Sequence, residues 1–135
     1  MRKQSEIGFS FIELMVVIVI IGLLTSVVAL NVLPSQDRAM SEKARADVAI
    51  LSQAVEMFRL ENLRYPSMDD GLDALLPDGD RQGYIKALPK DPWGNEYLYL
   101  IPGENGVFDV MSLGADGRLG GEGEDADIGN WLQQQ

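Results

Sequence analysis

The sequence predicts an α+β protein in which one long N-terminal helix packs on a small antiparallel β-sheet. Three observations support this prediction: an apolar block over residues 9–30, apolar residues at helical spacing over residues 35–63, and short segments of alternating polarity after residue 95. The chain has 135 residues, which is the length of one domain. The part outside the apolar block is therefore small.

The composition excludes several kinds of chemistry. The chain contains no histidine and no cysteine, so it has no Ser-His-Asp triad, no cysteine nucleophile, no zinc site of the Cys/His kind and no disulfide. Its net charge of −10 disfavours contact with the phosphate backbone of nucleic acids. Because no convergent acid/base set is visible either, we expect a protein that is not an enzyme and that binds no nucleic acid.

The apolar block, Phe9 to Leu30, is long enough to cross a membrane. As a helix it would span roughly 33 Å, and its one charged residue is Glu13. Arg2 and Lys3 predict a cytoplasmic N-terminus, so all residues after the block are expected on the far side of the membrane. The block is longer than the apolar region of a cleaved secretory signal. A plain anchor would leave Glu13 unexplained, because a carboxylate in hydrocarbon is costly and marks a functional candidate.

The residues after the block have the pattern of an amphipathic helix. Apolar residues recur every three or four positions on one face: Ala44, Val48, Leu51, Val55 and Phe58. No proline or glycine interrupts residues 35–63, so the helix is expected to continue from the apolar block, bend at Pro34 and stop before Pro66. We expect its apolar face to pack on the rest of the domain.

Residues 64–96 are rich in proline and glycine and are expected to be mostly loop, with a short helix around residues 70–76. Two strands are predicted to follow, at residues 96–101 and 107–113, joined by a turn. Trp93 lies in an Asp-Pro-Trp-Gly turn and is expected to pack on the long helix. The tyrosines are expected in the core or on edge strands: Tyr65, Tyr84, Tyr97 and Tyr99.

The segment from Gly114 to Gly129 is rich in glycine and acidic residues. It cannot bury apolar surface and should be disordered alone, yet Ile128 and Trp131 at its end are residues that usually pack. Something must therefore organise the loop between Leu113 and Trp131. The spacing of its acids does not match an EF-hand, and from spacing alone a metal site and a solvated acidic loop both remain open.

The N-terminal motif Gly8-Phe9-Ser10-Phe11-Ile12-Glu13-Leu14, with its aliphatic continuation, resembles the class III signal of type IV pilins and type II secretion pseudopilins. The resemblance implies that a prepilin peptidase removes a leader of residues 1–8 by cutting after Gly8, and that Phe9 is then N-methylated. It also implies that Glu13 acts in assembly. In a fibre, its carboxylate would pair with the N-terminal amine of a neighbouring copy, which compensates both buried charges. Ser10 stands where most members have threonine.

The rest of the chain resembles the major pseudopilins of the type II secretion system. The matching motifs are Arg64-Tyr65-Pro66, Gly71-Leu72, Gly83-Tyr84-Ile85, Leu88 to Gly94, Ser112 to Gly117 and Asp125 to Trp131. This resemblance implies a C-terminal calcium-binding loop. Its implied ligands are the backbone carbonyl of Leu113 and the side chains of Asp116, Asp125 and Asp127, with Asp127 less firm than the other two acids. Glu122 and Glu124 are expected to face solvent.

The implied function is that of a structural subunit of a periplasmic pseudopilus, which acts in exporting folded proteins across an outer membrane. Residues 9–30 would be the membrane and assembly helix, and residues 31–135 the periplasmic domain, with the chain crossing the inner membrane once. The implied partners are further copies in a helical fibre, minor pseudopilins, the prepilin peptidase and an inner-membrane assembly platform, with the membrane itself before assembly.

Two alternatives remain open on the sequence. The chain could be a type IV pilin of a surface fibre, although its lack of cysteine and its Asp-Pro-Trp-Gly turn argue against this. It could also be a membrane-anchored calcium-binding module that does not polymerise. One departure from the family pattern matters: Leu30 stands where relatives often carry a proline. The helix is therefore expected to continue past this point, with any unwinding reduced or shifted toward Pro34.

Overall fold

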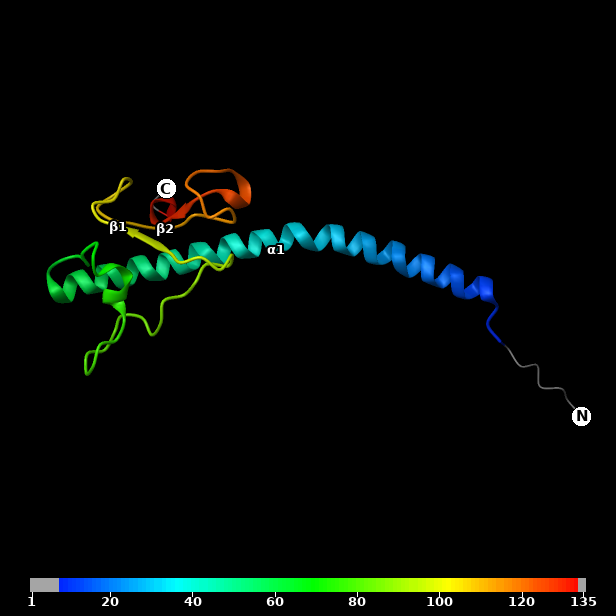
Figure 1. Ribbon diagram of the computed structural model, residues 1–135, viewed down its shortest axis with the longest axis horizontal. Coiled ribbons are helices and arrows are strands. Elements are labelled where there is room, and N and C mark those ends of the chain that lie inside the picture. The colour runs from blue at the N-terminus through cyan, green and yellow to red at the C-terminus, as the bar shows by residue number, and fades with distance from the viewer. Residues whose placement is uncertain (1–7, 134–135) are drawn as a thin grey trace, which may run out of the picture. The chain divides into compact units, whose positions relative to one another are not determined.

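The computed structural model of the protein describes residues 8–133, without the side chains of residues 29–34. Arg2, Lys3 and the predicted leader before Gly8 lie outside the described residues, as do the side chains of Leu30 and Pro34. The chain divides after Gln36 into two compact units. The elements, labelled in part in Figure 1, are the helix α1 (Phe11–Asn62), the 3₁₀ helices η1 (Gly71–Leu75), η2 (Gly123–Asp125) and η3 (Asn130–Gln133), and the strands β1 (Leu98–Leu100), β2 (Asp109–Ser112) and β3 (Ile128–Gly129).

The first unit is the N-terminal part of α1. Its residues Phe11–Val28 are long and apolar enough to cross a membrane, a test that a signal sequence near an N-terminus would also pass, and none of this stretch is buried within the chain. The hydroxyl groups of Thr25 and Ser26 donate hydrogen bonds to the carbonyls of Ile21 and Gly22, at 2.7 and 2.9 Å. Both hydroxyls are therefore satisfied inside the helix, as a lipid environment requires.

The second unit is built on the amphipathic part of α1. The five residues of the predicted apolar face are all at most 1% exposed, which confirms the expected packing: Ala44, Val48, Leu51, Val55 and Phe58. The helix ends at Asn62, before Pro66 as expected. Leu63 adopts a left-handed conformation with a φ of 58°, and its N–H donates to the Arg59 carbonyl at 2.8 Å. This geometry is an αL helix end.

The sheet has the order β1-β2-β3 and is antiparallel throughout. The central strand pairs Met111 with Leu98 on one side and with Gly129 on the other. β1 and β2 are shorter than the predicted strands. Before β2, the buried Asp109 carboxylate accepts the N–H groups of Glu104 and Asn105 in a bend. Before β1, Glu96 pairs with Lys90 in an isolated bridge outside the sheet. β3 was not predicted, since two residues carry no alternation pattern.

The core of the second unit lies between α1 and the sheet. Figure 1 shows β1 and β2 running beside the C-terminal part of α1, and residues from both elements form one buried cluster. The Tyr97 hydroxyl donates to Asp47 on α1, and the Tyr99 hydroxyl donates to the Pro66 carbonyl, each at 2.8 Å. Burial raises the pKa of Tyr99 to about 12. Both tyrosines are core residues, as expected, and Trp93 is half-buried against the same cluster.

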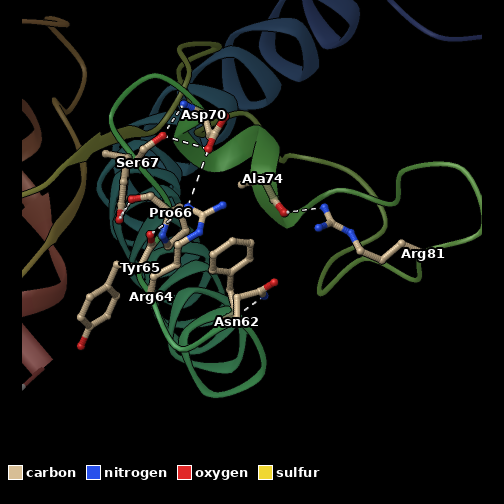
Figure 2. Close-up of polar contacts among 10 residues, drawn as sticks. Asn62, Arg64, Tyr65, Pro66, Ser67, Asp70, Ala74 and Arg81 are labelled. Carbon is tan, nitrogen blue, oxygen red and sulfur yellow. Dashed lines mark hydrogen bonds and ion pairs between the residues drawn. The ribbon is translucent and has the colours of Figure 1, made fainter.

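The chain reverses after α1 in a compact turn, shown in Figure 2. The Ser67 hydroxyl donates to an Asp70 carboxylate oxygen at 2.9 Å, and the Asp70 N–H donates back to the Ser67 hydroxyl at 3.1 Å. The Arg64 guanidinium lies 4.0 Å from the same Asp70 oxygen. This reciprocal pair precedes the predicted short helix, which is the 3₁₀ helix η1.

Candidate functional site

The predicted processing segment lies just before α1. Gly8, Phe9 and Ser10 are exposed and belong to no regular element. A peptidase needs such an accessible backbone, and the Gly8–Phe9 bond is located where it could be reached. A Cβ built on Gly8 would have no described residue beyond its chain neighbours within 4 Å.

Ser10 and Glu13 form a capping box at the start of α1. The Ser10 N–H donates to a Glu13 carboxylate oxygen at 3.0 Å, and the Glu13 N–H donates to the Ser10 hydroxyl at 3.3 Å. This reciprocal arrangement satisfies two N–H groups at the helix start. Sequence reasoning missed this role of Glu13, although the Ser-x-x-Glu signature is legible in the sequence. Glu13 therefore has a contact inside its own chain in addition to any contact in an assembly.

A buried network of hydrogen bonds joins the Asp-Pro-Trp-Gly turn to the first residue of the acidic loop. One oxygen of the Asp91 carboxylate accepts the N–H groups of Trp93 and Asn95, at 3.1 and 2.7 Å. The other oxygen accepts the Ser112 hydroxyl at 2.8 Å, and that hydroxyl accepts the Gly114 N–H at 3.2 Å. Sequence analysis identified the Asp-Pro-Trp-Gly turn but assigned no role to the Asp91 side chain.

Inside the loop, its two ends lie against each other. The Ala115 N–H donates to the Glu124 carbonyl at 2.9 Å. Gly114 has a φ of 76°, and a Cβ on it would lie 2.8 Å from the carbonyl oxygens of Glu124 and Ala126, so glycine is needed for this close approach. The backbone after Leu113 and the backbone around Asp125 are thus brought together, with the carbonyl oxygens of Glu124 and Ala126 at the contact.

The predicted acidic ligands lie in different surroundings. Asp127 is half-buried: one oxygen accepts the Gly120 N–H at 2.9 Å, and the other is buried without a hydrogen-bond partner. Asp116 is exposed and accepts the Arg118 N–H at 3.0 Å. Asp125 is exposed. Within residues 8–133, no three acidic side chains are arranged to hold one metal ion, so the structure does not bring the three predicted acids together as a ligand set.

Two features of the loop nevertheless fit a hard cation. A buried carboxylate oxygen without a donor, as on Asp127, is a costly group that a cation would satisfy. The crowded carbonyls around Gly114 add the neutral oxygen ligands that calcium prefers. Glu122 and Glu124 are exposed, as expected, and the neighbouring Asp37 carboxyl raises the pKa of Glu124.

Two family descriptions match the chain. "Type II secretion system (T2SS), protein G" matches residues 31–131, and "Prokaryotic N-terminal methylation motif" matches residues 3–29. Together they cover both the apolar helix and the second compact unit.

Similar proteins carry the same description. A type II secretion system core protein G of Vibrio cholerae is 51% identical over 97% of this chain and 94% of its own length. One from Pseudomonas aeruginosa is 46% identical over 97% and 99%. Among solved structures, the crystal structure of the major pseudopilin from the type 2 secretion system of enterohaemorrhagic Escherichia coli matches with a TM-score of 0.64. It is 39% identical, and the match covers 74% of this chain and 89% of that one.

Proposed function

Because this chain belongs to the protein G family of the type II secretion system, we infer that it is a structural subunit of the pseudopilus that acts in secreting folded proteins across the outer membrane. One observation carries this conclusion: the likeness extends over the methylation motif and the whole folded unit, at up to 51% identity. The major pseudopilin predicted from the sequence motifs is thereby confirmed. The family is a structural one, and the absence of a catalytic role in this chain stays a prediction.

The helix Phe11–Val28 and the family together fit a membrane-anchored subunit of a periplasmic fibre. We propose the finer topology that the charges predict, with the N-terminus in the cytoplasm, one crossing of the inner membrane and the folded unit in the periplasm. The proposed partners are further copies of the chain, minor pseudopilins, the prepilin peptidase and the inner-membrane assembly platform. A type IV pilin of a surface fibre is the less favoured alternative, because the relatives named above are type II secretion proteins.

The secretion role is tested by deleting the gene for this chain in its own bacterium. Folded proteins that normally reach the medium should then accumulate in the periplasm, and the wild-type gene on a plasmid should restore their release. Unchanged release from a deletion strain that contains no trace of the chain would contradict the proposed function.

Processing is tested at the predicted cleavage site. Mass spectrometry of the mature protein should show a chain that begins at N-methylated Phe9. Gly8→Val should leave the precursor uncut, because glycine has no side chain and lets the extended backbone enter a tight peptidase site, whereas a branched side chain would obstruct it. A Gly8→Val variant that still carried N-methylated Phe9 would contradict the proposed need for glycine at position 8, and wild-type protein with a different mature N-terminus would show that the cleavage site has been assigned wrongly.

For the acidic loop we propose calcium binding. Asp127, Asp116, Asp125 and the Leu113 carbonyl would supply oxygen ligands, and the ion would neutralise acids that otherwise repel one another. The unpartnered Asp127 oxygen supports this proposal and makes Asp127 the firmest of the three acids. The chain has no cysteine to close its C-terminal loop by a disulfide, so a bound ion would take over that stabilising role.

A further inference from the structure

We propose that Asp91, which lies outside the acidic loop, is a positioning residue that fixes the first peptide of this loop and thereby sets its affinity for a divalent cation. The inference rests on the calcium binding proposed above. Asp91 is 21 residues before Ser112 in sequence and is only 4% exposed. Sequence spacing therefore gives no sign of its link to the loop.

The first step is that the turn holds the Asp91 carboxylate rigidly. The Asp91 N–H donates to the Asn95 carbonyl at 2.8 Å, and the Gly94 N–H donates to the Asp91 carbonyl at 3.0 Å. With Trp93 and Asn95 both donating to one carboxylate oxygen, the second oxygen has a fixed direction. That oxygen points to the end of β2.

The second step is that the Asp91 carboxylate fixes the orientation of the Ser112 hydroxyl. Ser112 is fully buried, and a carboxylate can only accept a hydrogen bond, so the Ser112 hydroxyl must donate to Asp91. Its oxygen is then left to accept the Gly114 N–H. A hydroxyl free to rotate could turn away, but this one is oriented by the carboxylate behind it.

The third step concerns the peptide group that Ser112 holds. The Gly114 N–H and the Leu113 carbonyl belong to the same planar peptide unit, which is trans. Holding the N–H toward Ser112 therefore directs the Leu113 carbonyl the opposite way. Asp91 thus controls the orientation of a proposed backbone ligand without touching it.

The charge of Asp91 has no partner of opposite sign nearby. Among the described residues, no lysine or arginine nitrogen lies within 4.0 Å of its carboxylate, and its contacts are hydrogen bonds from neutral groups. A buried anion of this kind is stabilised by a cation in the adjacent loop. Such outer partners of a metal site typically change metal affinity by 10–100-fold when they are removed.

Two substitutions separate the parts of this network. Asp91→Asn keeps the size of the side chain. Its oxygen must still face the two N–H donors of the turn, so its NH₂ group faces Ser112 and reverses that hydrogen bond while removing the charge. Ser112→Ala keeps the charge and breaks the link. Asp80→Asn, at an exposed loop position, removes the same charge without touching the network and is the matched control.

The experiment is a calcium titration by calorimetry on the full-length protein in detergent micelles, below the melting temperature of each variant. Asp91→Asn and Ser112→Ala should each bind calcium about 10-fold more weakly or worse than wild type. Asp80→Asn should stay within about twofold, because exposed charges are screened. Hydrogen exchange in chelator should show a less protected Gly114 amide in both network variants.

Folded variants that bound calcium as tightly as wild type would overturn the role of Asp91 and leave the proposed metal site intact. If Asp91→Asn does not fold, Ser112→Ala decides the question alone. Wild-type protein that bound no calcium would end both proposals, so the wild-type titration tells the two failures apart.

Discussion

Leu63 combines two unfavourable features at the end of α1. It is a β-carbon-bearing residue in a left-handed conformation, and its side chain is 90% exposed. This conformation costs an L-residue about 1–2 kcal/mol, whereas glycine adopts it freely and is the usual residue at this helix position. Its side chain buries almost no apolar surface that could offset this cost, since it is almost fully in solvent.

Replacing this residue should therefore stabilise the folded unit. Leu63→Gly is expected to raise the free energy of unfolding by roughly 0.5–1 kcal/mol, after the higher chain entropy of unfolded glycine is subtracted. The control is Leu60→Gly, an exposed position three residues earlier inside the helix, where glycine should destabilise by about 1 kcal/mol. Thermal unfolding followed by circular dichroism measures both, and equal destabilisation by the two substitutions would refute the strain at Leu63.

For single residues, the sequence predicted which positions are buried better than it predicted which side chains form hydrogen bonds. The core positions of α1 followed from spacing alone, because a helix has one period and one buried face. The contact between Asp91 and Ser112 could not be predicted, because it joins segments that only the folded chain brings together. Ser10 and Glu13 are the exception: their capping contact is local, so the sequence does contain the signal for it.

β3 and η3 close the second unit at its C-terminal end. Gly129 pairs with Met111, and a methyl group on Gly129 would overlap the ring of Trp131. The Trp131 ring thus lies directly on the backbone of β3, which explains why a tryptophan follows the acidic loop. This packing depends on one glycine.

Gly129→Ala should force that ring away and destabilise the fold by about 1–3 kcal/mol, the usual cost of overpacking. The matched control is Gly106→Ala, where the added methyl would meet only the Phe108 carbonyl oxygen at 3.9 Å, and the effect should stay within about 0.5 kcal/mol. Urea unfolding with tryptophan fluorescence measures both. An equal midpoint for Gly129→Ala and wild type would contradict the described packing.

The backbone of α1 is helical from Phe11 to Asn62, so it is helical across residues 22–30 in the single chain. The behaviour of this stretch in an assembled fibre stays a prediction. Because Leu30 can continue a helix where many relatives have proline, we expect less unwinding between Gly22 and Leu30, and we expect Leu30→Pro to reduce secretion only slightly. A fibre map with residues 22–30 fully unwound would contradict this expectation.

The long helix and the positions of η1, β1 and β2 were predictable from the sequence, whereas β3 was not. α1 repeats its pattern over many turns, whereas β3 has two residues and owes its pairing to β2. The predicted strand ends were too long, because the buried Asp109 carboxylate draws the preceding residues into a turn. This side chain–backbone contact spans only four to five residues and overrides the alternation pattern there.

For the whole molecule, the proposed calcium site predicts a stability that depends on free calcium. An ion present at about 100 times its dissociation constant would add about 2.7 kcal/mol and raise the melting temperature by roughly 10–20 °C. Excess chelator should remove this gain and expose the loop around Gly120 to protease. Asp127→Ala should make the protein insensitive to chelator, whereas the exposed Glu122→Ala should respond like wild type. Identical melting with calcium and with chelator would leave only a solvated acidic loop.

The central claim is that copies of this chain polymerise through their N-terminal helices, with Glu13 as a charged partner. Photo-crosslinking in living cells tests it most directly, with a photoreactive amino acid in place of Leu24, which is exposed in the single chain. Irradiation should give a ladder of covalent multimers of this chain. Glu13→Gln can keep the capping contact to Ser10 but lacks the charge, so it should abolish the ladder while leaving the membrane-inserted protein intact. An unchanged ladder in Glu13→Gln would remove the charge-pairing role, and irradiated wild type that stayed monomeric would contradict polymerisation itself.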